Sequence, residues 1–365
     1  MAKQKVVNPK RRTTLRDVAD YVGCSTAVVS TVINGSRGRS MASEQLSQRI
    51  TQAAQKLGYR PDFVSQSMAR RSTRTLGVYV EKGEGTSISY PYESTIICGV
   101  EQACQQHEYD LLIISLSGKA APQVCLNKMI ERRVDGLILL HVLHDATWID
   151  SLLARQDHVV TVNYYGPAPL LSVNFDNKAA TAMAVRHLYE LGHRRIGYVG
   201  SLMMWGPGEQ LRSDGYHEAM AQLNLPIDPL WVVDDRTAPP TGMASEHEYD
   251  AVAHHMIQLG NARPTAIVCG SDWAAIGLTR YFRRHGLEVP GDMSVIGHDD
   301  KQICRYFDPP MSSIHQPLEA MGRKAAELLI QRTSKPKQNT SKAHGNPPLV
   351  APKLVQREST APPRP

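Results

Sequence analysis

The chain lacks any apolar run near the roughly 18 residues that a membrane-spanning helix needs, and no apolar segment follows its basic start, MAKQKVVNPKRR. We therefore expect neither a membrane span nor a secretory leader, and we expect the protein in the cytoplasm. The six cysteines are scattered and form no Cys-x-x-Cys pair. This spacing favours reduced thiols over a disulfide framework or a zinc site.

Motifs of common enzyme classes are also missing. The sequence contains no Gly-x-Ser-x-Gly, no Walker A loop and no His-Glu-x-x-His. The Gly-x-Gly of KGEGTS lacks a third glycine, so it is a weak signal for a dinucleotide site. We predict that the protein is not an enzyme, that it has no catalytic residues, and that it needs no cofactor and no metal ion.

Positive charge is concentrated at the N-terminal end. Residues 1–74 contain 14 Lys and Arg against four Asp and Glu, a net charge of +10, and the rest of the chain has a net charge of −4. A basic segment ahead of a nearly neutral body indicates binding to nucleic acid or to an anionic membrane surface. Composition alone leaves both partners open.

Residues 15–34 read LRDVADYVGCSTAVVSTVIN, the pattern of two short helices separated by a turn. Thr14 and Asp17 can form a capping box before an apolar face that ends at Gly23, and Ser25 can cap the next helix. Two helices joined by a short turn with glycine predict a helix-turn-helix, whose second helix lies in the DNA major groove. A third helix is expected over residues 43–57.

The outward positions of the second helix are small and polar. Methyl groups of Ala and Thr can pack on thymine, and hydroxyl and amide groups can bind base edges or phosphates. The alternative is an ordinary solvated helix surface, which the turn, the spacing and the local charge argue against. We assign the following residues to DNA contact: Thr14, Ser25, Thr26, Ala27, Ser30, Thr31 and Asn34.

From Thr75 the pattern changes to that of a second domain. Apolar runs of strand length alternate with helix-length amphipathic segments, and the runs cover residues 75–80, 109–115, 134–140, 158–163, 195–200, 265–270 and 293–298. This alternation predicts an α/β doubly wound domain with parallel sheets, and its length favours two lobes. One last strand is expected within residues 354–359.

The segments TLRDVADYVGCSTAVVSTVING, LGYRP and RSTRTLGV resemble the DNA-binding head and hinge of the lac repressor (LacI/GalR) family of bacterial transcription regulators. Further matches follow in order: ERRVDGLIL, HLYELGHRRIGYVG, LRSDGYHEAM, RPTAIVCGSDWAAIG, VPGDMSVIGHDD, DPPMSSIHQPLEAMG and RESTAPP. The resemblance implies an all-α helix-turn-helix head, a hinge helix, and a two-lobed doubly wound domain similar to periplasmic sugar-binding proteins.

The resemblance also implies the boundaries of these parts. We expect a disordered basic tail over residues 1–12, the head over 13–60, the hinge over 61–74, and an effector-binding and dimerisation domain over 75–365. Lobe 1 would comprise about 75–174 and 304–332, and lobe 2 about 175–303 and 333–365.

Members of the family are homodimers that bind a pseudo-palindromic operator, and a hinge leucine of each subunit wedges into the minor groove. Met68 occupies that position here, and Arg70, Arg71 and Arg74 match phosphate contacts. Thr31 stands where the family usually has arginine, so the operator should differ from the commonest family sequence. The loop after the second helix adds Arg37 and Arg39 near the DNA backbone.

The resemblance further implies a small-molecule site between the lobes. Arg212 and Asp272 match the positions that hold sugar hydroxyls, and the alternative for this pair is an ion pair between lobes. The other positions implied for this site are Pro91, Tyr92, Asn163 and Trp205. For Trp205, an aromatic of a surface loop is an equally good interpretation.

The implied function is a transcriptional repressor that responds to a sugar-like effector and associates with the nucleoid when bound to its operator. Two alternatives stay open. The large domain could respond to a partner protein, or the chain could be a stand-alone carbohydrate-binding protein, although such a protein would carry a leader and no basic head.

Overall fold

The structure is a computed structural model. It describes residues 12–34, 42–81, 88–117, 121–140, 154–155, 158–166, 170–200, 206–234, 249–334 and 349–364. The chain divides into two compact units, Met1–Thr75 with Glu131–Asp135, and Leu76–Ile130 with Gly136–Pro365. Among the described residues, no helix is both long enough and apolar enough to cross a membrane.

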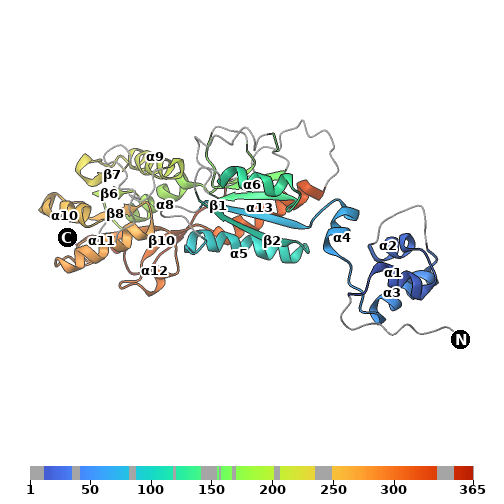
Figure 1. Cartoon of the computed structure of the whole chain (residues 1–365). Coiled ribbons are helices and arrows are strands. Elements are labelled where there is room, and N and C mark those ends of the chain that lie inside the picture. The colour runs from blue at the N-terminus through green and yellow to red at the C-terminus, as the bar shows by residue number, and fades with distance from the viewer. Residues whose placement is uncertain are drawn as a thin grey trace. The chain divides into compact units, whose positions relative to one another are not determined.

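The predicted helix-turn-helix is present near the N-terminus. It consists of α1 (Leu15–Val22) and α2 (Thr26–Asn34), which pack with α3 (Glu44–Lys56) (Figure 1). Val18, Val29 and Ile50 contribute one fully buried side chain from each helix. Gly23 ends α1 with a φ of 78°, a left-handed conformation that glycine adopts at little cost.

Thr14 caps α1 as predicted. Its hydroxyl oxygen accepts a hydrogen bond from the Asp17 amide, and the Asp17 carboxylate accepts one from the Thr14 amide at 2.8 Å. Replacing Thr14 by alanine removes one side of this box, and should destabilise α1 by about 1 kcal/mol. Faster hydrogen exchange of the α1 amides in the full chain would show this. Thr51→Ala, on the exposed side of α3, is the control, and equal exchange in both variants would contradict the prediction.

The basic segment after the head also forms a helix, α4 (Phe63–Arg70). Asp62 caps its start, because its carboxylate accepts a hydrogen bond from the Val64 amide at 2.8 Å. The helix ends at Arg71, whose φ of 56° is left-handed and therefore unusual for a residue with a side chain.

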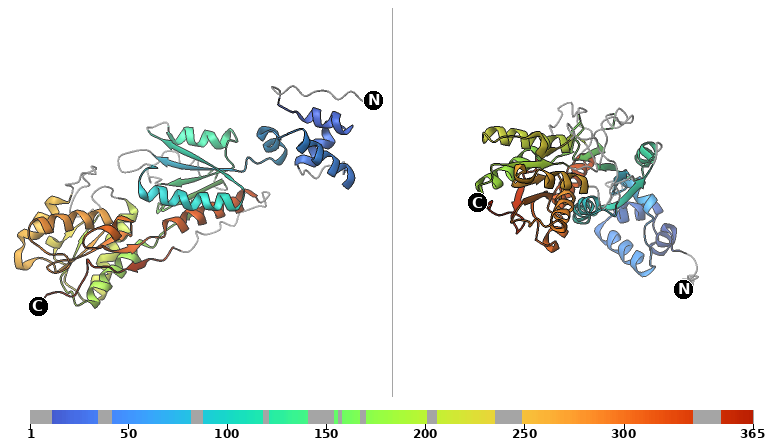
Figure 2. Two further views of the ribbon diagram at one scale, coloured as in Figure 1. Left: turned by 90° about the horizontal axis from the view of Figure 1, so that it is seen from below. Right: turned by 90° about the vertical axis from the view of Figure 1, so that its left-hand side faces the viewer.

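The first sheet has the strand order β2-β1-β3-β4-β5, and the β1–β3, β3–β4 and β4–β5 pairs are parallel. Its strands are β1 (Thr75–Glu81), β2 (Asp110–Leu116), β3 (Gly136–Leu140), β4 (Val159–Val162) and β5 (Ser172–Val173). On one face lie α5 (Pro91–Gln106) and α13 (Leu318–Ser334), and on the other lies α6 (Ala121–Ile130) (Figure 2).

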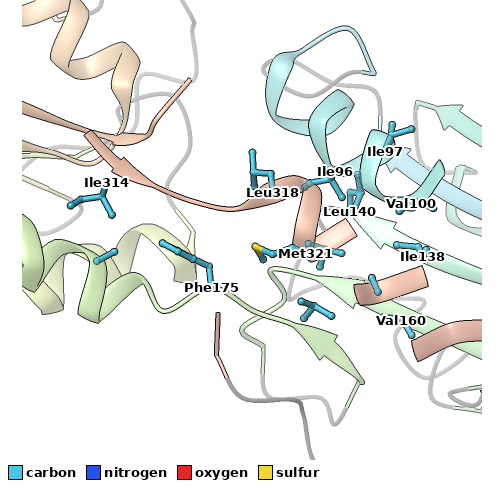
Figure 3. Close-up of a cluster of buried hydrophobic side chains, with 14 of the residues drawn as sticks. Ile96, Ile97, Val100, Ile138, Leu140, Val160, Phe175, Ile314, Leu318 and Met321 are labelled. Carbon is cyan, nitrogen blue, oxygen red and sulfur yellow. The ribbon is translucent and has the colours of Figure 1, made fainter. Parts of the chain in front are cut away.

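Two glycines allow α5 and α13 to approach closely. A Cβ atom at Gly99 would lie 1.8 Å from the Glu319 carbonyl oxygen, and one at Gly322 would lie 2.0 Å from the Ile96 carbonyl oxygen. Ile96 and Met321 are buried beside this contact (Figure 3). The helix from the C-terminal part of the chain is thereby fixed to the first sheet.

The second sheet has the order β11-β10-β9-β8-β6-β7. Its strands are β6 (Ile196–Val199), β7 (Val232–Val233), β8 (Ala266–Cys269), β9 (Ser294–Asp299), β10 (Ser312–His315) and β11 (Lys353–Val355). Only β11 is antiparallel to its neighbour among the described pairs. The helices of this lobe are α8 (Asn177–Glu190), α9 (Pro207–Gln222), α10 (Asp250–Gln258), α11 (Asp272–Arg284) and α12 (Ile303–Tyr306), with 3-10 turns at Pro229–Trp231 and Gly260–Ala262.

Side chains of the second sheet alternate between two apolar layers, as the period of two in a strand requires. Val268 and Ile296 pack in one cluster with α8 and α9, whereas Ile267 and Val295 pack in another with α10 and α11. Helices on both faces of a largely parallel sheet confirm the doubly wound prediction for this lobe.

The expected lobe boundary is wrong for part of the chain. Residues 304–332 were expected in lobe 1, but β10 pairs with β9 and belongs to the second sheet, while α13 packs on α5 of the first lobe. The chain therefore crosses between the lobes at Gln316 and Pro317, after β10. A second crossing passes through Phe175, which forms a bridge with Val350.

The C-terminal segment is held by two buried histidines of the second lobe. The Nε2 of His193 lies 2.8 Å from the Ala361 carbonyl oxygen, and its Nδ1 lies 2.9 Å from the Thr265 hydroxyl. The Nε2 of His187 lies 3.1 Å from the Thr360 hydroxyl. Burial lowers the pKa of both imidazoles below the ordinary value of 6.5.

Stability should therefore fall on the acid side of neutrality. Because the pKa of His193 is lower in the folded chain than in the unfolded one, the unfolded chain binds more protons as the pH drops below 6.5. Urea unfolding between about pH 7.5 and about pH 5 should show a decreasing free energy of unfolding. His193→Gln should show a smaller slope, and an equal slope in both proteins would contradict this role.

Candidate functional site

The outward face of α2, to which we assign DNA contact, is accessible. Ser25, Thr26 and Ala27 are exposed, and Thr31 and Asn34 are partly exposed. The Thr31 hydroxyl donates to the Ala27 carbonyl at 2.9 Å, and the Asn34 amide donates to the Ser30 hydroxyl at 3.1 Å. These bonds fix the side chains on one helix face, where they can exchange local partners for groups of a DNA base.

Three large apolar side chains of α4 are exposed to solvent. Met68 is 76% exposed, Val64 is 62% exposed and Phe63 is 53% exposed. Exposed apolar side chains on one short helix are typical of an interaction surface. The exposure of Met68 fits a wedge that enters a DNA base step.

Of the arginines assigned to DNA contact, three lie in the described part of the chain and two lie outside it. Arg70 and Arg71 are exposed at the C-terminal end of α4. Arg37 and Arg39 lie outside the described residues, and so does Trp205 of the effector assignment.

A second polar cluster lies in the two-lobed unit, at the carboxyl ends of parallel strands and the amino ends of helices. Asn163 follows β4 and Asp299 ends β9, while Tyr92 lies in the first turn of α5 and Arg212 lies on α9. The carboxyl edge of a doubly wound sheet is where such folds bind ligands. Pro91 is exposed at the first position of α5.

Tyr92 and Asn163, which the resemblance assigns to the effector site, lie in contact. The Asn163 side-chain amide donates to the Tyr92 hydroxyl at 2.5 Å. The Tyr165 hydroxyl donates to the Asn163 side-chain oxygen at 3.0 Å, and accepts from the Asn177 amide at 2.7 Å. Burial and the nearby Asp299 raise the pKa of Tyr92 to about 12, so its hydroxyl keeps its proton at neutral pH.

Arg212 lies at the centre of the cluster, with 14% of its side chain exposed. Its guanidinium donates to the Asn177 side-chain oxygen at 2.8 Å and to the Gly270 carbonyl at 2.5 Å. Its guanidinium nitrogens also lie 3.6 Å from a carboxylate oxygen of Glu209 and 3.9 Å from one of Asp299. Arg212 therefore connects α8, α9 and the ends of two strands of the second sheet.

Asp299 is the carboxylate that faces Arg212. Burial alone would raise its pKa, but Lys301 and Arg212 outweigh burial and hold the pKa below its ordinary value. The Lys301 ammonium binds one carboxylate oxygen. The other, Oδ1, is buried and has no hydrogen-bond partner among the described residues.

Asp272, which the resemblance assigns to the effector, lies at the first position of α11. Its Oδ1 accepts from the Ser313 hydroxyl at 2.6 Å, its Oδ2 accepts from the Lys301 amide at 2.7 Å, and the side chain is fully buried. Burial raises its pKa to about 6. Both oxygens of Asp272 thus accept hydrogen bonds from the second lobe, whereas Oδ1 of Asp299 accepts none among the described residues.

Sequence reasoning missed Tyr165, Asn177 and Asp299. Asp299 follows directly after the buried run MSVIGH, so the rule that polar groups at carboxyl ends of strands line a site would have found it. Asn177 begins a helix, and Tyr165 follows two residues after Asn163. Their approach to Arg212 depends on tertiary contacts between segments far apart in the chain.

The cluster offers donors and acceptors for a small polyhydroxylated molecule. Arg212 and Asn177 supply donors, and Oδ1 of Asp299, 3.9 Å from the Arg212 guanidinium, is an acceptor without a hydrogen bond among the described residues. The Nε2 of His298 is also buried without a hydrogen-bond partner among the described residues, and burial and Arg212 lower the pKa of this imidazole. Buried polar atoms without hydrogen-bond partners are one feature of ligand sites.

The sequence matches two protein families, one in each part of the chain. Residues 14–62 match bacterial regulatory proteins of the lacI family, and residues 185–360 match the periplasmic binding protein-like domain. The chain is 30% identical to the ribose operon repressor of Haemophilus influenzae over 349 residues, which cover 95% of this chain and 98% of the relative. It is also 30% identical to the HTH-type transcriptional repressor PurR of Photobacterium profundum, with 94% and 98% covered.

Solved structures have the same architecture. The lac repressor dimer bound to operator and the anti-inducer ONPF matches with a TM-score of 0.76 at 25% identity, covering 96% of this chain and all of that chain. A complex of the transcriptional regulator CelR with cellobiose matches with a TM-score of 0.66 at 25% identity, covering 95% of this chain and all of that chain.

Proposed function

The chain belongs to the lacI family of bacterial regulatory proteins, and on this premise we propose that it represses transcription by binding a specific DNA operator. One observation supports this most. The small polar face of α2 and the exposed Met68 of α4 belong to the same compact unit. The first surface suits direct contact with bases in the major groove, and the second suits a wedge in the minor groove.

Each part of the chain has its own role in this function. We assign residues 13–60 to the DNA-binding head, 61–74 to the hinge and 75–365 to effector binding and dimerisation. DNA contact is assigned to Thr14 and the α2 face, and phosphate contact to Arg70, Arg71 and the loop arginines Arg37 and Arg39. The protein acts as a homodimer on a pseudo-palindromic operator, as a dimer of the lac repressor does in its operator complex.

The effector is a small polyhydroxylated molecule bound around Arg212. Two similar proteins support a carbohydrate, since one is named a ribose operon repressor and another is solved with cellobiose. Arg212, Asp299, Tyr92 and Asn163 contact the effector, and Asp272 positions Lys301 beside it. Binding shifts the arrangement of the lobes, and this shift changes the population of the ordered hinge and thereby the operator affinity.

The chain has no enzymatic activity in this proposal. Similarity along nearly its whole length to two transcriptional repressors supports this. It works in the cytoplasm and associates with the nucleoid when it binds its operator.

Selection of binding sites from a random double-stranded DNA pool tests the proposal. The full-length protein should enrich a palindromic duplex with a deformable central step, with salt held fixed because affinity for DNA depends steeply on it. Enrichment of sequences without two-fold symmetry would contradict the dimeric operator, and no enrichment would contradict sequence-specific binding. The enriched sequence is called the selected duplex below.

Thr31→Arg should change the base preference of the protein. Arginine can donate two hydrogen bonds to guanine, and such a pair contributes about 1–3 kcal/mol of discrimination. A second selection with this variant should therefore introduce guanine at one position of each half-site. Thr51→Arg adds the same charge on α3 and should leave the preference unchanged. If Thr31→Arg and the parent protein select identical sequences, Thr31 does not contact DNA bases.

A further inference from the structure

We propose that Asp135 is the positioning residue that anchors the hinge helix and keeps α4 ordered. This inference rests on the proposed DNA-binding function. Asp135 lies in the turn between α6 and β3, far along the chain from the hinge, yet Glu131–Asp135 belongs to the same compact unit as the head and hinge.

The Asp135 carboxylate accepts four hydrogen bonds from three consecutive residues. Its Oδ1 accepts from the Thr73 amide at 2.7 Å and from the Thr73 hydroxyl at 2.9 Å. Its Oδ2 accepts from the Ser72 hydroxyl at 2.5 Å and from the Arg74 amide at 2.9 Å. In addition, the Asp135 amide donates to the Thr75 carbonyl at 2.8 Å.

Ser72 connects this anchor to the end of α4. Its backbone amide donates to the Ser67 carbonyl at 3.2 Å and so takes part in the C-terminal cap of the helix, while its hydroxyl donates to Asp135. The Arg71 amide donates to the same Ser67 carbonyl. The cap of the hinge helix and the start of β1 are therefore held through one side chain.

The anchor opposes the low intrinsic stability of α4. A helix of eight residues is marginal alone, and α4 ends on Arg71 in a left-handed conformation that disfavours a side chain. Thr73 is 8% exposed, so removal of the carboxylate leaves the buried Thr73 amide and hydroxyl without this acceptor. Residues 71 and 72, which cap α4, are then no longer held in place, and α4 becomes less ordered.

The predicted consequence is a selective loss of operator affinity. DNA binding by a disordered hinge includes the free-energy cost of ordering it, which weakens specific binding. Contacts of the head with phosphates do not depend on the hinge, so non-specific binding should persist. Loss of a negative charge near DNA would by itself strengthen binding, so weaker binding cannot come from electrostatics.

Asp135→Asn tests the anchor, because the asparagine keeps the size of the side chain but places a donor or a single oxygen where two acceptors are needed. Glu131→Gln makes the same charge change at an exposed position of the same turn and is the matched control. Full-length proteins would be titrated with the selected duplex and with a scrambled duplex at one salt concentration. Hydrogen exchange of the amides of residues 71–74 would be measured in the free chains.

We expect Asp135→Asn to bind the selected duplex at least about tenfold more weakly than the control, a loss equivalent to one or two hydrogen bonds to a charged group. Binding to the scrambled duplex should agree within about twofold, and exchange at residues 71–74 should accelerate only in Asp135→Asn. Ser72→Ala removes the hydroxyl bond to Asp135 and the bond that this hydroxyl accepts from the Arg74 amide at 3.2 Å, and leaves the other bonds to the carboxylate. It should show a smaller loss of the same kind.

Equal binding of the selected duplex by Asp135→Asn and Glu131→Gln would overturn the anchor, as would equal losses on both duplexes. The parent protein is measured in the same titration. If it does not prefer the selected duplex, the proposed function fails and the anchor fails with it. If it does and the two variants behave alike, only the anchor fails.

Discussion

Replacing Arg212 by alanine should abolish the response of operator binding to effector while leaving operator binding without effector intact. The guanidinium is the central donor of the polar cluster, with bonds to Asn177 and Gly270 and with Asp299 at 3.9 Å. Hydrogen bonds to charged groups contribute about 1.5–3 kcal/mol each, so loss of two to a ligand lowers effector affinity at least about 100-fold.

The measurement needs an effector identified on the parent protein. Sugars would be screened for those that change its affinity for the selected duplex, and the variant would be titrated with the active compounds. Arg212→Lys is the second variant, because it keeps the charge beside Asp299 and Glu209 but loses the planar fork. A normal response in Arg212→Ala would remove this residue from the site.

Replacing Met68 by serine should weaken binding to the selected duplex by about 30-fold or more, because a polar side chain cannot hold an unstacked base step open. Binding to a scrambled duplex should change little. Since Met68 is 76% exposed in the free protein, the substitution should not lower the free energy of unfolding. A loss of specific affinity can then be assigned to DNA contact rather than to misfolding.

Met68→Leu is the matched control for the wedge. Leucine keeps an apolar side chain of similar volume, so the preference for the selected duplex should be retained. Equal losses of specific and non-specific affinity in Met68→Ser, or no loss at all, would contradict the wedge.

Much of the fold follows from local patterns. Thr14, Asp17 and Gly23 form their cap and turn within a few residues of one another, and the apolar runs at residues 136–140 and 266–269 become fully buried strands. The strands that escaped prediction are short or polar. β5 and β7 have two residues each. The sequence of β10 is SSIH, which contains no apolar run that would predict a strand.

The lobe boundary was wrong for the same reason. Ser312 and Ser313 are fully buried because they pair with β9 and bind Ser359 and Asp272, partners far away in the chain. A sequence pattern records the polarity of these serines and not their tertiary partners, so the segment was grouped with the helix that follows it.

The candidate site shows the same division between local and tertiary information. The motifs identified Arg212, Tyr92 and Asn163, and the structure brings these residues into one cluster through Tyr165 and Asn177. Which carboxylate faces Arg212 is a tertiary property. The oxygens of Asp272 accept hydrogen bonds from Ser313 and Lys301, whereas Oδ1 of Asp299 faces Arg212 at 3.9 Å.

Hydrogen exchange of the full-length chain, free and bound to the selected duplex, tests the central claim most directly. We expect strong new protection in α2 (Thr26–Asn34) and α4 (Phe63–Arg70), because one helix enters the major groove and the other binds in the minor groove. The scrambled duplex should protect α4 far less. Protection confined to the two-lobed unit, or equal protection of α4 by both duplexes, would contradict sequence-specific binding through the head and hinge.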